Sequence, residues 1–241
     1  MKRTLGMLLL LTLLLTTLIG CADDAIEPGI PEPLKPTEIP VKREDPKVDT
    51  TDYAAAVKEK LWSLEATSGE WFEAMDVDGG VAITGYHGTS TVVRIPERIG
   101  DKTVVAIADG AFETVKNDKN DVNAAEQAVE AVELTVLYIP DSVKTIGRGI
   151  LAGNHTLTAL RTPLLSASSE EEQYIGYLFG GESYRDNGKT PLTLAYVWYD
   201  AESETLSDYA FADCNKLVAV LLGERVTKIG NFAFSFCGSL K

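Results

Sequence analysis

A fixed period of 23 residues is the feature that most narrows what this chain can fold into. Near the carboxyl end, Leu206–Cys214 (LSDYAFADC) recurs as Ile229–Cys237 (IGNFAFSFC) at that spacing. Further upstream, Leu134–Pro140 (LTVLYIP) recurs as Leu157–Pro163 (LTALRTP) at the same spacing. Segments of constant length that recur along a chain are typical of stacked repeat architectures, in which each unit contacts its neighbours.

Each repeat contains a short stretch of alternating apolar residues, which predicts a β-strand because alternate side chains of a strand face the same side. No single repeat can bury its own apolar flank, so we expect the strands to lie side by side, about 4.8 Å apart, in a parallel sheet. The leading leucines should then form one buried row: Leu134, Leu157, Leu194 and Leu217.

Two departures from the period are interpreted as insertions. The distance from Leu157 to Leu194 exceeds one period by 14 residues, and glycines within residues 164–193 supply turns for an inserted loop. A second insertion of 16 residues precedes Leu134. Its apolar residues have helical spacing, which predicts a short helix packed outside the repeats, and they are Val122, Ala125, Val129 and Val132.

These motifs resemble the BspA-type leucine-rich repeats of surface proteins from anaerobic bacteria and some protists. The residues that carry the resemblance, over about residues 77–241, are Ile83–Gly88, Ile139–Gly147, Tyr177–Tyr184, Ala210–Cys214 and Ala233–Cys237. The resemblance implies an α/β leucine-rich-repeat solenoid, dominated by short parallel strands, that acts as a binding module. Ile150-Leu151 in place of Ala-Phe, and Gly223 in place of proline, are interpreted as marks of degenerate repeats.

The amino-terminal end has the form of an export signal. Residues 1–20 combine a basic start with an apolar run, and that run is shorter than the roughly 20 residues that a membrane span needs. It ends in Leu18-Ile19-Gly20-Cys21, which looks like the lipobox of bacterial lipoproteins and implies a lipid on Cys21. An ordinary signal peptide with an incidental cysteine is the alternative. Residues 21–50 hold six of the ten prolines, which predicts an extended acidic tether.

Residues 51–76 are predicted to form a helix and the start of a cap before the repeats at 77–241. The helix spans Thr51 to Leu64, and it should dock on the first end of the stack, although a free amphipathic helix is the alternative. Its apolar side is formed by Tyr53, Val57, Leu61 and Leu64. A hairpin from Trp71 to Ile83, turning at Asp78-Gly79, should cover the first open strand edge.

The last repeat is incomplete, because the chain stops at Lys241 just after Leu240 has begun another unit. An uncovered strand edge invites pairing. We therefore expect either that the chain is a fragment or that this end pairs with a partner, which includes end-to-end self-association.

Charge and residue types argue against several function classes. The 22 basic and 36 acidic residues give a net charge of -14, which argues against nucleic-acid binding. The two histidines, His87 and His155, lie in no nucleophile motif, so we assign no catalytic residue, no cofactor and no enzyme activity. The plentiful carboxylates leave a glycosidase pair open by number alone.

Metal sites and a disulfide are also weighed against simpler interpretations. Asp76–Gly79 and Asn117–Asp121 lack the long loop and final glutamate of a calcium site, so we interpret both as turns and predict no metal. Cys214 and Cys237 occupy equivalent slots one repeat apart. We favour free thiols there, and a disulfide remains the alternative.

Outward positions of the strands bring aromatic residues and an arginine together in the predicted register. Tyr138, Arg161, Tyr196 and Trp198 should form one patch of the residue types that dominate binding hot spots. We therefore predict a lipid-anchored surface module that binds or adheres to a protein or glycan. The alternatives are that the insertion at 164–193 covers Tyr196 and Trp198, that the chain is a scaffold for a further domain, or that it is a non-catalytic accessory to a surface hydrolase system.

Overall fold

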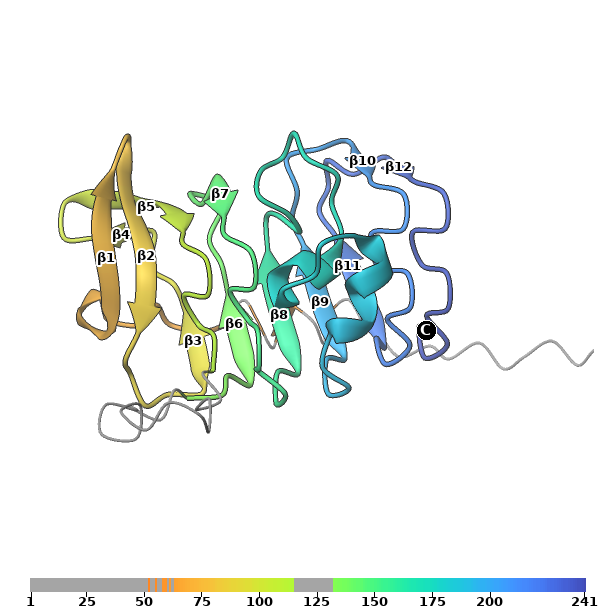
Figure 1. The fold of residues 1–241 in the computed structure, drawn as a ribbon, viewed down its shortest axis with the longest axis horizontal. Coiled ribbons are helices and arrows are strands. Elements are labelled where there is room, and N and C mark those ends of the chain that lie inside the picture. The colour runs from red at the N-terminus through yellow and green to blue at the C-terminus, as the bar shows by residue number, and fades with distance from the viewer. Residues whose placement is uncertain (1–51, 53–54, 56–57, 60, 62, 115–131) are drawn as a thin grey trace, which may run out of the picture. The chain divides into compact units, whose positions relative to one another are not determined.

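Five short parallel strands, one from each repeat, form a sheet along one side of the molecule, which we call the repeat sheet (Figure 1). The computed structural model describes residues 52, 55, 58–59, 61, 63–114 and 132–241, all within the unit Asp49–Lys241. The sheet order is β11-β9-β8-β6-β3. The strands are β3 (Val92–Arg94), β6 (Val136–Tyr138), β8 (Ala159–Thr162), β9 (Tyr196–Tyr199) and β11 (Ala219–Leu222).

The register of the repeat sheet follows the 23-residue frame. Inward residues are paired across all five strands, and they are Val93, Leu137, Leu160, Val197 and Val220. Leu134 and Leu157 are 0% exposed, and Leu194 and Leu217 are 1% exposed. All four belong to the main apolar core. The predicted buried row is therefore confirmed, as is a strand-dominated leucine-rich-repeat fold.

The wall of the molecule that faces the repeat sheet across the core, which we call the opposite wall, begins with the predicted hairpin. Strands β1 (Phe72–Val77) and β2 (Gly80–Tyr86) are antiparallel, after the short 3-10 helix η1 (Gly69–Trp71). The turn lies at Asp78-Gly79, where Gly79 adopts a left-handed φ of 81°. Strand β2 pairs in parallel with β5 (Lys102–Ile107), so the hairpin covers the edge of this wall. The remaining strands of the wall are β4 (Arg98–Ile99), β7 (Thr145–Ile146), β10 (Thr205–Leu206) and β12 (Lys228–Ile229).

The insertion at 164–193 is part of this opposite wall. It contains the 3-10 helices η3 (Ile175–Phe179) and η4 (Tyr184–Lys189), drawn in teal and blue in Figure 1. The Leu151 amide donates to the Leu178 carbonyl, and the Ile175 amide donates to the Ala210 carbonyl. The insertion thus bridges two repeats on this wall. The alternative that it covers Tyr196 and Trp198 is wrong, because its backbone finds its hydrogen-bond partners on the opposite wall.

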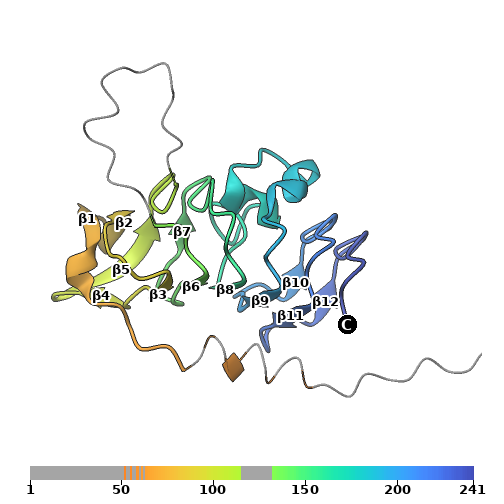
Figure 2. The ribbon, with the colours of Figure 1, turned by 90° about the horizontal axis from the view of Figure 1, so that it is seen from below.

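The amino-terminal segment contacts the first repeat, as predicted, and also packs on the outer face of the repeat sheet, which was not predicted. Its described residues Ala55, Lys58, Glu59 and Leu61 are helical. Leu61 is 0% exposed and belongs to a cluster on the outer face of the repeat sheet, along which the segment runs in Figure 2. The helix therefore neither stands free nor only docks on the first end. The physical reason is that the outer face offers apolar and aromatic side chains across several strands.

Contacts with the first repeat do occur just after this helix. The Thr67 amide donates to the Arg94 carbonyl at 2.9 Å, and an Arg94 Nη donates to the Leu64 carbonyl at 2.9 Å. The segment therefore crosses the sheet and ends beside β3.

Several predictions fall on residues outside the described ones. These are the signal at 1–20, the tether at 21–50 with Cys21, the turn at Asn117–Asp121, and the helix at Val122, Ala125 and Val129. Val132 is described, and it is not helical.

Candidate functional site

The outer face of the repeat sheet carries a column of alternating cations and aromatic rings, which we call the cation–aromatic ladder. Its members are Arg94, Tyr138, Arg161 and Trp198, and they are register partners on β3, β6, β8 and β9. The Arg94 guanidinium lies 4.2 Å from the Tyr138 ring centroid. Arg161 lies 4.9 Å from Tyr138 and 5.5 Å from Trp198. Contacts within about 6 Å of a ring centroid are attractive because the ring face is negative.

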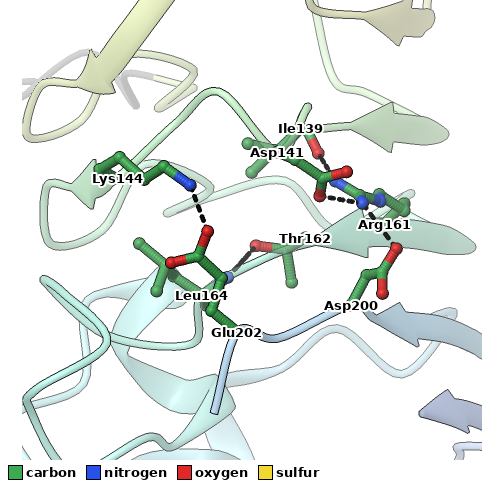
Figure 3. A network of polar contacts seen from close by, with 8 residues as sticks. All are labelled: Ile139, Asp141, Lys144, Arg161, Thr162, Leu164, Asp200 and Glu202. Atoms are coloured by element: carbon green, nitrogen blue, oxygen red, sulfur yellow. Dashed lines mark hydrogen bonds and ion pairs between the residues drawn. The ribbon is translucent and has the colours of Figure 1, made fainter. Parts of the chain in front are cut away.

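Arg161 is the best-anchored member of the ladder. Its side chain is 1% exposed, and one Nη donates to the Ile139 carbonyl at 2.5 Å. Its other Nη donates to Asp200 Oδ2 at 2.8 Å and also to Asp141, as Figure 3 shows. A buried guanidinium needs such partners because desolvation of an unpaired charge is costly.

The four predicted site residues therefore come together, but three of them are not an open outward patch. Tyr138 and Trp198 are 6% exposed and Arg161 is 1% exposed, while Tyr196 is half-buried. Leu61 belongs to the same buried cluster as Tyr138 and Trp198. Alternation along a strand places these side chains on the outer face, and it carries no information about a segment that packs over them.

A cleft of about 670 Å³ opens at the Trp198 end of the ladder. This volume lies within the range of small-ligand sites, roughly 300–1,000 Å³. Strands β9 and β11 and the residues that follow them form one side, and the amino-terminal segment forms the other. The lining residues are Trp198, Asp200, Leu221, Leu222, Gly223, Glu224 and Arg225 on the repeats, and Lys58, Glu59 and Ser63 on the segment.

Sequence reasoning missed most of these lining residues, although one signal pointed to them. Gly223 departs from the proline pattern, and the structure gives the reason. A Cβ at Gly223 would overlap Oδ1 of Asp200, and the Gly223 amide donates to the Tyr199 carbonyl at 2.8 Å. Proline would not fit here, because its ring would overlap the Asp200 carboxylate and because it has no amide proton to donate to the Tyr199 carbonyl. Glycine at this position therefore leaves room for the Asp200 carboxylate.

A smaller cavity of about 170 Å³ lies next to the cleft and shares Asp200 and Arg225 with it. Lys144 Nζ lies 2.5 Å from Glu202 Oε1 across this cavity (Figure 3). The hydrogen bond from Lys144 lowers the pKa of Glu202. Both side chains are about half exposed, so water screens this pair and it adds little stability.

The remaining candidates are dispersed. His87 contacts Trp71, with ring centroids 6.0 Å apart. Cys214 and Cys237 are free thiols, and burial raises the pKa of Cys214 to about 12. Within the ranges that the structure describes, no three His, Cys, Asp or Glu side chains are arranged to hold a metal ion. The helices among those residues are also too short or too polar to cross a bilayer.

A sheet with one parallel strand per repeat, and with the leucines of successive repeats buried in a row, defines a leucine-rich-repeat protein. Residues 193–241 match the family model described as a BspA type leucine rich repeat region of six copies. This match covers the last two repeats of the chain, and it agrees with the resemblance of their sequence to BspA-type leucine-rich repeats.

Three solved structures are similar to this chain at low identity. The leucine-rich repeat protein of T. pallidum is 22% identical over 73% of this chain and 69% of its own, with a TM-score of 0.44. A leucine-rich cell surface protein of Faecalibacterium prausnitzii A2-165 is 20% identical over 74% and 54%, with a TM-score of 0.40. A leucine-rich repeat protein of Bacteroides capillosus ATCC 29799 is 20% identical over 66% and 93%, with a TM-score of 0.30. No curated protein matches this chain.

Proposed function

We propose that this chain is a lipid-anchored binding module of the bacterial cell surface, built as a repeat solenoid, and that it takes a protein or glycan ligand in the cleft beside Trp198. The observation that carries the proposal is the cleft itself. It combines an aromatic wall and leucines with charged side chains on its rim, in a volume of about 670 Å³. Ligand sites characteristically combine an apolar lining with a few placed polar groups.

The side of the cleft formed by the repeats is preorganised. Trp198 is fixed by its strand and by Arg161, whose guanidinium is held by the Ile139 carbonyl and by Asp200. A site that is already ordered loses less conformational entropy when a ligand binds. This favours binding in the cleft over binding to an exposed loop of the same composition.

Membrane attachment through Cys21 and the tether at 21–50 is the second part of the proposal. A diacylglycerol thioether with an additional acyl chain provides firm attachment, whereas a single chain binds only marginally. Labelling of cells with radioactive palmitate should mark the wild-type protein and leave Cys21→Ala unlabelled. Equal label in the two proteins would contradict the lipid anchor.

Binding is tested with the purified full chain against immobilised collagen, fibrinogen, fibronectin, mucin and xylan. Leu221→Arg places a long cationic side chain in the cleft, and we expect it to weaken saturable binding at least tenfold. Leu192→Arg is the matched control, because Leu192 is 74% exposed and lies outside this cleft. Saturable binding that Leu221→Arg leaves unchanged would overturn the site, and a lack of any saturable ligand would favour the scaffold alternative.

A further inference from the structure

The cation–aromatic ladder ends on an aromatic ring. From β3 to β9 its members alternate as arginine, tyrosine, arginine and tryptophan, but the register partner of Trp198 on β11 is Leu221. The position that would continue the alternation as a cation is therefore occupied by an aliphatic side chain. Leu221 is half-buried and lines the cleft together with Trp198.

Three carboxylates line the same cleft as Leu221. Asp200, Glu224 and Glu59 all line the cleft, the first two on the repeats and the third on the amino-terminal segment. Two cations, Lys58 and Arg225, also lie on its rim, and Arg225 borders the smaller cavity as well. The cleft thus combines the Trp198 ring, leucine side chains and three carboxylates, of which Glu224 and Glu59 are exposed and Asp200 is paired with Arg161.

We infer that the cleft binds a lysine or arginine side chain of a protein ligand, with its charged head on Asp200 and Glu224 and its stem along Leu221 and Trp198. The inference rests on the proposed function and specifies the ligand as a basic protein segment. Long cationic side chains bury their methylene stems on apolar surface while the head seeks charge. An indole ring beside a cation adds a further attraction.

Asp200 is positioned for this role by two independent features. Its Oδ2 accepts a hydrogen bond from Arg161 at 2.8 Å, which fixes the orientation of the carboxylate (Figure 3). Its Oδ1 lies over Gly223, where a Cβ would displace it. Because Gly223 lines the cleft and Asp200 is 31% exposed, the carboxylate is both anchored and accessible.

The charge of the whole chain favours the same ligand class. With 36 acidic and 22 basic residues, its long-range field attracts cationic partners and raises their local concentration. A neutral glycan would gain nothing from this field. A basic peptide gains from both the field and the local carboxylates.

The test uses fluorescein-labelled octalysine, octaglutamate and a neutral Ser-Gly octapeptide with the purified full chain, measured by fluorescence anisotropy. We expect saturable binding of octalysine only, with a Kd that rises about tenfold in Asp200→Asn and several-fold in Glu224→Gln. Glu171→Gln is the matched control, because it removes the same charge from an exposed position in the insertion, outside the cleft. Gly223→Ala should also weaken octalysine binding, since the new methyl group displaces the Asp200 carboxylate.

The binding of octalysine by the variants distinguishes a specific site from non-specific attraction. If Glu171→Gln weakens octalysine binding as much as Asp200→Asn and Glu224→Gln, the attraction is non-specific and the inference is wrong. Because Asp200→Asn also alters the contact with Arg161, Glu224→Gln provides the independent variant. Suppose instead that an immobilised protein or glycan binds the wild type, binds Asp200→Asn and Glu224→Gln equally well, and fails to bind Leu221→Arg. That result would support the proposed function and refute the basic ligand.

Discussion

Truncation of Arg161 to alanine should destabilise the fold more than any other change to the ladder. Two cation–π contacts of a desolvated guanidinium contribute about 1 kcal/mol each, and a charged donor to a buried carbonyl contributes about 1.5 kcal/mol. The pair with Asp141 adds little, because that carboxylate is 69% exposed. Since neighbouring contacts are not fully additive, we expect a loss of about 3 kcal/mol.

Urea denaturation of the purified chain, followed by circular dichroism, measures this loss. With an m-value of about 2 kcal/mol per M, the midpoint should fall by about 1.5 M. The midpoint of Arg161→Lys should decrease about half as much, because lysine keeps the positive charge but lacks the planar guanidinium group. Arg185→Ala is the control, since Arg185 is exposed and lies over the Tyr184 ring at 5.7 Å. If Arg161→Ala shifts the midpoint no more than this control, the ladder does not stabilise the fold.

Three further predictions concern other parts of the structure. Leu61→Asp should release the amino-terminal segment and shift tryptophan emission to longer wavelength, whereas Ser63→Asp should not; an unchanged spectrum would contradict the packing of Leu61. Burial raises the pKa of Cys214 to about 12. Between about pH 9 and 12 only the unfolded thiol ionises, so the stability of the fold should decrease as the pH rises through this range. Urea midpoints measured at each pH should decrease less steeply in Cys214→Ala than in the wild type. Asn187→Ala should cost about 2 kcal/mol in urea, because it leaves two backbone partners unpaired, while exposed Asn215→Ala should cost less than about 0.5 kcal/mol.

The packing of the amino-terminal segment could not be predicted from the sequence, and neither could its effect on the ladder. The spacing of Tyr53, Val57, Leu61 and Leu64 indicated a helix with one apolar side. A helical pattern does not identify the surface on which that side is buried, because any apolar surface within reach would serve. The structure shows that Leu61 lies in the cluster with Tyr138 and Trp198, and this contact converts an outward aromatic patch into a largely covered one.

The period of the sequence by itself determined the repeat sheet. A constant spacing of 23 residues places equivalent side chains of successive repeats side by side, so the row from Leu134 to Leu217 follows from counting. The same counting brought Tyr138, Arg161 and Trp198 into one column. Only the tertiary structure decided that Asp200 lies beside Gly223 in a cleft, and that the insertion joins the opposite wall. Those contacts depend on where loops and the amino-terminal segment pack, and no periodic pattern encodes that choice.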